Sequence, residues 1–192
     1  MKYLIILVIL ILIGVGGFYI QSKDHDNAVT QGMMKMSDDM HKGMGHDDHA
    51  MMVKDDKSFI EGMIPHHEEA VVSSKELLEV AQTPEVKELA QNIITAQEKE
   101  ISQMKAWHQS WFDEPYKDNG MYKPMMKPLN TKEAQSAEQS YLHDMITHHQ
   151  AAVAMAKAIQ PITKREELKT LSNDIISTQN EEIILMQRLL KK

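Results

Sequence analysis

The sequence predicts an all-α protein: a four-helix bundle built from two duplicated helical hairpins and preceded by an N-terminal membrane helix. The main observation is an internal repeat. Residues 59–106 align without a gap to residues 141–188, at an offset of 82, and 16 of the 48 pairs are identical. Within each copy, apolar residues recur every three to four positions, as in amphipathic helices. Two such hairpins, each with one apolar face, can bury those faces only against each other, so they form one bundle.

Composition narrows the function classes. The chain has 192 residues and no cysteine, which excludes disulfides and thiolate metal sites. Its 28 acidic and 21 basic residues give a net charge of −7, and the basic residues are scattered, so no nucleic-acid partner is expected. The chain has 16 Met and 10 His, a bias toward thioether and imidazole donors.

A hydrophobic segment opens the chain. Leu4–Ile20 is an uncharged apolar run behind Lys2 and has neither an Ala-x-Ala-like cleavage site nor a lipid-accepting Cys. We therefore interpret residues 1–21 as an uncleaved single-pass anchor in the cell membrane. Lys2 stays in the cytoplasm, and everything after Gln21 lies outside, on the periplasmic side. Cleavage after one of three glycines (Gly14, Gly16 or Gly17) is the alternative, and it would make the protein periplasmic or secreted.

Residues 22–54 are predicted to be a flexible tether rich in Met and His. Ten of the twenty residues from 33 to 52 are Met or His, and the others include glycines and charged residues that cannot build a core. An idle linker needs no thioethers, whereas Met and His together suit copper in both oxidation states. We therefore expect the tether to collect metal, and its candidate ligands are Met40, His41, Met44, His46 and His49.

Residues 55–192 are predicted to form the bundle. The first hairpin covers 55–109, and its second helix begins at Pro84, with Thr83 as the N-cap. Residues 110–130 contain three prolines and a glycine, so they form a linker, either a local loop or a crossover along the bundle. The second hairpin covers 131–192, with Thr131 at its start.

Apolar packing does not explain the polar residues that the repeat conserves. When the first half is folded about residues 82–83, His66 and His67 lie level with the Gln97–Glu100 turn, and Met63 lies near Met104. The equivalent residues of the second half are Met145, His148, His149, Gln179, Glu182 and Met186. We expect His66 and His148 to be the inner pair, with their neighbours His67 and His149 turned about 100° away.

These donors predict a copper site. Thioether and imidazole without thiolate suit Cu(I), and imidazole with carboxylate suits Cu(II). The candidate ligands are Met63, His66, His67, Met104, Met145, His148, His149 and Met186, with Glu100 and Glu182 as further candidates. Core packing by Met, and hydrogen bonding of Gln and Glu to the rings, remain open as alternatives. Three other histidines, His25, His108 and His143, have no repeat partner and receive no role.

The motifs resemble a known family. The string Met63-Ile64-Pro65-His66-His67, followed by Gln97-x2-Glu100-Ile101-x2-Met104, is similar to the "domain of unknown function 305" family, whose members include CopM-like periplasmic copper-binding proteins. The resemblance covers about residues 55–190 and implies a ferritin-like four-helix bundle outside the cytoplasmic membrane, with Met and His binding copper. The second copy has Thr147 where the first has Pro65.

The leading hypothesis is an extracytoplasmic copper-binding protein, not an enzyme, that sequesters copper or relays it to a copper-transfer protein. One alternative is a ferritin-like metal-dependent oxidase. A di-iron bundle needs about four carboxylates and two Glu-x-x-His pairs, and the sequence has no Glu-x-x-His. The other alternative is a structural or adaptor bundle with a hydrogen-bonded polar core.

Overall fold

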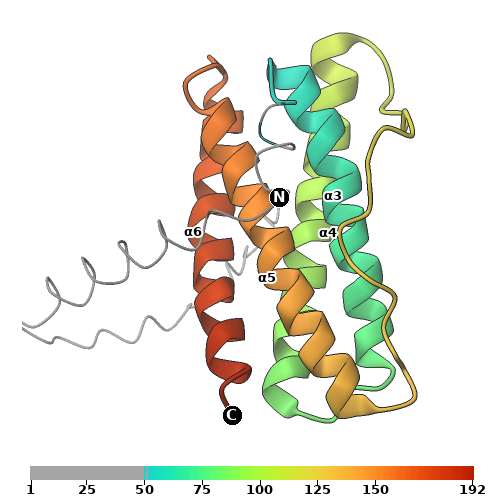
Figure 1. The fold of residues 1–192 in the computed structure, drawn as a ribbon. Coiled ribbons are helices and arrows are strands. Elements are labelled where there is room, and N and C mark those ends of the chain that lie inside the picture. Colours follow the sequence, from blue (N-terminus) through green and yellow to red (C-terminus); the bar gives the residue numbers. More distant parts are fainter. Residues whose placement is uncertain (1–49, 51) are drawn as a thin grey trace, which may run out of the picture. The chain divides into compact units, whose positions relative to one another are not determined.

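The computed structural model describes residue 50 and residues 52–192, and these contain four helices and no strand (Figure 1). The helices are α3 (Asp56–Leu78), α4 (Pro84–Phe112), α5 (Ala134–Ile159) and α6 (Glu166–Leu189). The predicted anchor at 1–21 and all but the end of the predicted tether lie outside the described residues. None of the four described helices combines the length and apolarity that a bilayer span needs.

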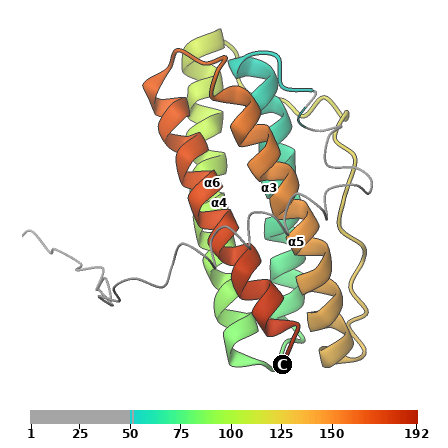
Figure 2. The same ribbon diagram turned by 60° about the vertical axis from the view of Figure 1, so that its left-hand side comes forward.

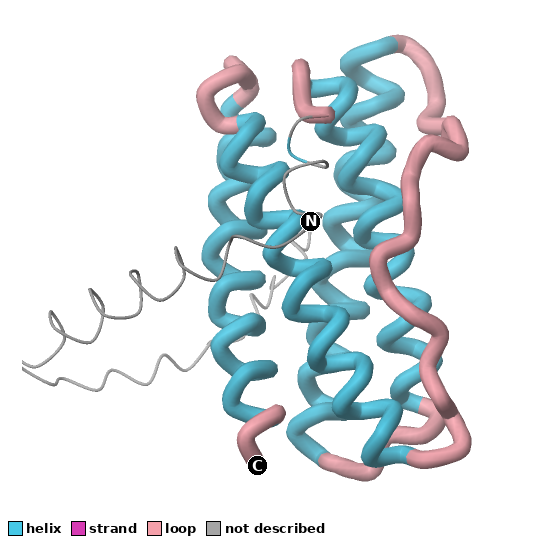
Figure 3. Tube along the Cα trace, in the orientation of Figure 1, coloured by secondary structure: helices cyan, strands magenta, loops and turns pink. Residues whose placement is uncertain are grey.

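The four helices form a bundle of two hairpins. Helices α3 and α4 pack along each other, as do α5 and α6, and the two hairpins meet mainly through α3 and α5. The segment between α4 and α5 runs the length of the bundle, so it is a crossover and not a local loop (Figure 3). In both ribbon views the crossover stays on the side formed by α3 and α5 (Figures 1 and 2).

Helix α3 begins with a side-chain cap, whereas α4, α5 and α6 begin without one. Asp55 caps α3, since its carboxylate accepts the Ser58 N–H at 2.7 Å while the Ser58 hydroxyl accepts the Asp55 N–H at 3.0 Å. Helix α4 begins at Pro84 with Thr83 at the N-cap position, as predicted, but the Thr83 side chain makes no capping hydrogen bond. The Thr83 hydroxyl instead donates to the Glu138 carboxylate of α5 at 2.6 Å.

The linker lies three residues later than predicted. Helix α4 continues past residue 109 to Phe112, because Trp107 and Trp111 stack one turn apart with ring centroids 4.9 Å apart. It ends where Asp113 adopts a left-handed conformation, with φ of 56°. Helix α5 starts at Ala134 and not at Thr131, because the Asn130 side chain accepts the Lys132 N–H at 3.3 Å and holds a turn there.

The core consists of two apolar clusters with a polar layer between them. One cluster contains Met63 and Met104, and the other contains Met145 and Met186. Along α3 the chain passes from Met63 in the first cluster to Ala70 in the second, and along α5 from Met145 in the second to Ala152 in the first. The histidine pairs of both helices fall between those positions, at the middle of the bundle.

Candidate metal centre

Four histidine rings occupy the polar layer. His66, His67, His148 and His149 are each 0% exposed. The rings of His66 and His148 meet across the interface of α3 and α5, with centroids 3.7 Å apart. The neighbouring centroids are 6.1 Å apart for His66 and His67 and 6.3 Å apart for His148 and His149. The two repeats thus contribute to one continuous cluster of imidazoles, which we call the histidine cluster.

A glutamate of the partner helix holds the outer ring of each pair. His67 Nε2 lies 2.7 Å from a Glu100 carboxylate oxygen, and His149 Nε2 lies 2.8 Å from the equivalent oxygen of Glu182. A carboxylate accepts, so each Nε2 donates its proton in a hydrogen bond, and a neutral ring with this tautomer carries its lone pair on Nδ1. Both Nδ1 atoms are buried without a hydrogen-bond partner among the described residues.

Glu69 is a site residue that sequence reasoning missed. One of its carboxylate oxygens lies 3.3 Å from His148 Nε2 and accepts a hydrogen bond from the Tyr122 hydroxyl of the crossover. The other oxygen accepts the N–H groups of Met125 and Met126 at 2.9 and 3.0 Å. Its position three residues after His66, on the same helical face, could have indicated it. The repeat concealed it, since the offset of 82 places Ala151 at that position.

These contacts set the charges of the layer. Burial lowers the pKa of His148 to about 4, and the opposing effect of the Glu69 carboxylate is smaller, so this ring is neutral at pH 7. Burial alone would raise the pKa of Glu69, but the adjacent His148 ring and hydrogen bonds from Tyr122 and two backbone N–H groups lower it to about 2. Burial raises the pKa of Tyr122, and its bond to Glu69 raises it further. The layer therefore combines neutral imidazole with anionic carboxylate.

The layer also contains polar atoms that the described residues leave unsatisfied. His148 Nδ1 has no hydrogen-bond partner there, and neither does the amide oxygen of Gln97 or of its repeat equivalent, Gln179. Buried polar atoms without partners each cost about 1–3 kcal/mol. Imidazole lone pairs in such a layer are standard donors to copper, zinc, nickel and iron. The types of donor in this layer are therefore suitable for a metal ion.

The structure places the four predicted histidines in the polar layer and the four predicted methionines in the two apolar clusters on either side of it. Met63 lies one helical turn before His66 on α3, and Met145 lies one turn before His148 on α5. Met104 and Met186 pack in the same apolar clusters as Met63 and Met145, respectively. Glu100 and Glu182 are bonded to imidazole nitrogens. The tether candidates, Met40, His41, Met44, His46 and His49, lie outside the described residues.

Comparison with known proteins gives a consistent family match. The model of the family described as "Domain of unknown function (DUF305)" matches residues 19–108 and 56–190. Among solved structures, the chain is similar to CopM in the Ag-bound form, with 40% sequence identity and a TM-score of 0.65, covering 72% of this chain and 97% of that chain. CopM in the Cu(II)-bound form matches with 38% identity and a TM-score of 0.64, covering 73% and 98% of the two chains.

Two further relatives differ in how much of their length is matched. A DUF305 fragment from Deinococcus radiodurans is 30% identical, with a TM-score of 0.63, and the match covers 73% of this chain and 97% of the fragment. An uncharacterized protein of Acanthamoeba polyphaga mimivirus is 44% identical over 50 residues, and this chain spans only 33% of its length. In both the CopM and the Deinococcus structures, the match with this chain covers 97% of the solved chain.

Proposed function

The chain belongs to the DUF305 family, and we propose from its histidine cluster that it is a copper-binding protein that acts outside the cytoplasm. In this proposal copper is the cargo, which the protein sequesters or relays. Met and His side chains bind the ion, and no chemical reaction takes place on it.

The observation that carries the proposal is the orientation of the buried imidazoles. Glu100 and Glu182 each accept a hydrogen bond from the Nε2–H group of a fully buried histidine, which leaves Nδ1 as the nitrogen that can bind a metal. Metal-binding histidines commonly have this arrangement, in which a carboxylate fixes the tautomer and raises the basicity of the ring. We therefore infer that His67 and His149 bind the ion through Nδ1, and that the two glutamates position the rings.

The choice of copper rests on the softness of the nearby donors. Met63 and Met145 lie one turn from the inner histidines, and thioether with imidazole suits Cu(I) better than it suits zinc or iron. Solved structures of CopM, which is 37–40% identical, contain Ag, Cu(II) or Cu(I). Ag(I) and Cu(I) are both soft monovalent ions, so the relatives support a site for soft metals here as well.

The rest of the chain gives this site a setting in the proposal. Residues 1–21 anchor the protein in the membrane, or direct its export if they are cleaved. The Met and His residues of the tether collect copper near the bundle, and a copper-transfer protein receives it. These roles rest on the sequence pattern.

Copper titration of the bundle, residues 50–192, tests the proposal. The apoprotein is titrated under reducing conditions with Cu(I) against a competing chelator, and under oxidising conditions with Cu(II). The main variant replaces His67 and His149 with Ala. We expect it to lose at least about tenfold in affinity, since removing an outer group that supports a ligand already costs about 10–100-fold.

The matched control is His143→Ala, because His143 lies on α5 one turn before the pair but its side chain is 80% exposed. Far-ultraviolet circular dichroism establishes that each variant is folded. If the folded His67/His149 variant bound copper as tightly as His143→Ala, the histidine cluster would not be the copper site. The proposal would then have to move to the tether.

A further inference from the structure

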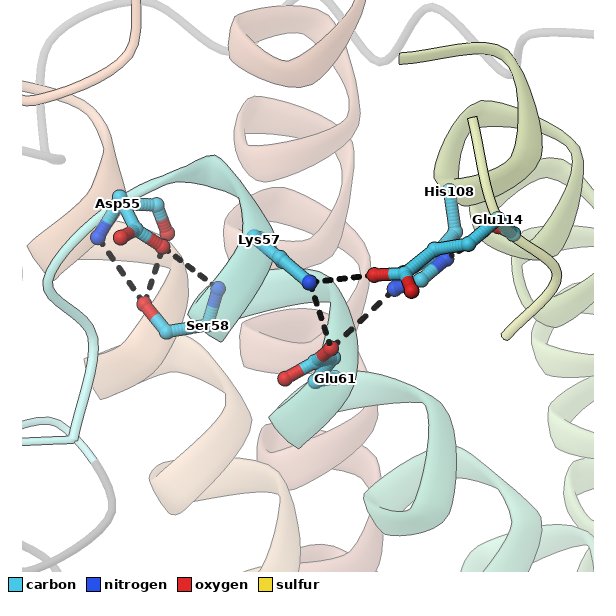
Figure 4. Close-up of polar contacts among 6 residues, drawn as sticks. All are labelled: Asp55, Lys57, Ser58, Glu61, His108 and Glu114. Atoms are coloured by element: carbon cyan, nitrogen blue, oxygen red, sulfur yellow. Dashed lines mark hydrogen bonds and ion pairs between the residues drawn. The ribbon is translucent and has the colours of Figure 1, made fainter. Parts of the chain in front are cut away.

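A second group of ligand side chains lies at the end of the bundle where α3 begins and α4 ends (Figure 4). Glu61 comes from α3, His108 from the last turns of α4, and Glu114 from the start of the crossover. One potential ligand atom from each of the three lies within 4.8 Å of the other two. Together with Pro115 and Lys117 they line a cavity of about 110 Å³.

The backbone fixes the orientation of His108. The ring is only 2% exposed, and its Nδ1 lies 2.9 Å from the carbonyl oxygen of Glu114. A carbonyl can only accept, so Nδ1 carries a proton and donates. The left-handed conformation of Asp113 turns the chain back and places that carbonyl against the ring. Nε2 is therefore the ring nitrogen that faces the cavity.

Nε2 meets a carboxylate there, because it lies 3.2 Å from Glu61 Oε1. A ring nitrogen with a lone pair and a carboxylate oxygen are both acceptors, so this contact is favourable only with a cation between them. The cation is either a proton on Nε2 or a metal ion. Ligands of a tetrahedral ion with bonds of about 2.0–2.1 Å are separated by about 3.3 Å, which the distance between Nε2 and Glu61 already matches.

We propose that Glu61, His108 and Glu114 form a binding site for a divalent metal ion of the zinc class. One imidazole and two carboxylates with a fourth position open to the cavity suit Zn(II), and the absence of a thioether makes the set unsuitable for Cu(I). The Glu114 side chain is 51% exposed, so its carboxylate is free to rotate toward the ion. The site is thus distinct from the histidine cluster in both place and chemistry.

Lys57 brings a positive charge to the two carboxylates of the proposed site. Its ammonium group bonds to the Glu114 carboxylate and lies 3.9 Å from Glu61 (Figure 4). The Lys57 side chain is 40% exposed, so it can withdraw into water when a dication arrives. Metal and lysine therefore compete for the same two carboxylates.

The second hairpin does not repeat these three side chains. At the offset of 82, Glu61 corresponds to His143 and His108 corresponds to Leu190, so the second hairpin has no equivalent group. The three ligands are not needed to complete a packing unit that the protein uses twice. They are specific to the end of the first hairpin.

Isothermal titration of residues 50–192 with Zn(II) tests the site. We expect Glu61→Gln and Glu114→Gln each to weaken one zinc site at least about tenfold, the lower end of the loss when even an outer group is removed. We expect Lys57→Gln to tighten the same site about fivefold, since an exposed ion pair that competes with the metal is worth up to about 1 kcal/mol. A simple structural ion pair does not predict this gain.

The control variants change the exposed ion pair of Lys75 and Glu98, whose charged atoms lie 2.6 Å apart. Glu98→Gln and Lys75→Gln should leave zinc binding unchanged. The inference is overturned if the wild-type bundle binds no Zn(II), if Glu61→Gln and Glu114→Gln bind it as the control variants do, or if Lys57→Gln binds it no more tightly than the wild type.

Discussion

Replacing Glu69 with Gln should release the crossover from the bundle and destabilise the fold. The carboxylate accepts hydrogen bonds from Tyr122 and from the N–H groups of Met125 and Met126, and it lies against His148. These bonds lower the pKa of Glu69 from 4.5 to about 2 despite burial. At 1.36 kcal/mol per pKa unit, the ionised form contributes roughly 3 kcal/mol at neutral pH. Gln keeps the shape, but it has no charge and presents an amide N–H to groups that donate.

The pH dependence follows from the sign of this shift. Between pH 4.5 and pH 2 the unfolded chain binds the Glu69 proton and the folded chain does not, so stability falls as the pH falls through that window. We expect Glu69→Gln to be less stable than the wild type by about 2–3 kcal/mol at pH 7. By pH 3 roughly 2 kcal/mol of the Glu69 contribution should be lost.

Urea unfolding of the metal-free bundle at pH 7 and pH 3 measures both effects. Glu98→Gln is the control, because that side chain is 51% exposed and its carboxylate forms an exposed ion pair with Lys75, so its loss should cost less than about 1 kcal/mol. Equal stability of Glu69→Gln and the wild type at pH 7 would refute the role assigned to this carboxylate. A stability difference between the two proteins that stayed constant between the two pH values would refute the pKa argument.

Three other predictions concern the core and the tether. Replacing His66 and His148 together should reduce the copper affinity of the full chain more than deleting residues 33–52, because a folded site is preorganised and a tether is not. Equal losses of affinity in a copper titration would contradict this ranking. The metal-free wild type should lose roughly 3 kcal/mol of its unfolding free energy between pH 6.5 and pH 4, because burial lowers the pKa of His148 to about 4 and the unfolded chain takes up the proton first. Urea unfolding across that pH range should show that the stability of His148→Gln falls less steeply with pH. Tyr141→Phe should destabilise the bundle by about 1–2 kcal/mol, since the Tyr141 hydroxyl lies 2.6 Å from the buried Ser74 hydroxyl, and an unchanged melting temperature would show that Ser74 finds another partner.

The helices were predictable because their information is local. Apolar spacing placed α3 to α6, and the prediction of an all-helical fold with four helices is confirmed for the described residues. The errors lie at the ends. Thr83 has the chemistry of an N-cap, yet its hydroxyl bonds to Glu138, which lies 55 residues away in the sequence. Helix α4 extends to Phe112 because the stacked rings of Trp107 and Trp111 stabilise one more turn. Helix propensities describe single residues and do not account for such a contact between side chains.

The site was predictable in its residue types and less so in its geometry. Conservation of His, Gln, Glu and Met between the repeats indicated a function, because packing requires none of them. The same reliance on the repeat hid Glu69, which has Ala151 as its counterpart, and His108, which has Leu190. Both side chains act with residues of the crossover, a segment that exists once.

The sequence by itself determined that the chain carries two equivalent hairpins, each with two imidazoles, two thioethers, an amide and a carboxylate at matching levels, because helical periodicity and the repeat are properties of the chain alone. Only the tertiary structure decided that α3 and α5 pack together and bring the rings of His66 and His148 to a centroid distance of 3.7 Å. The histidines of the two hairpins thereby form one cluster. The physical reason is that the apolar stripe of a helix specifies which of its faces is buried, but not which other helix packs against that face. The crossover, tied to α3 through Glu69, belongs to that same tertiary arrangement.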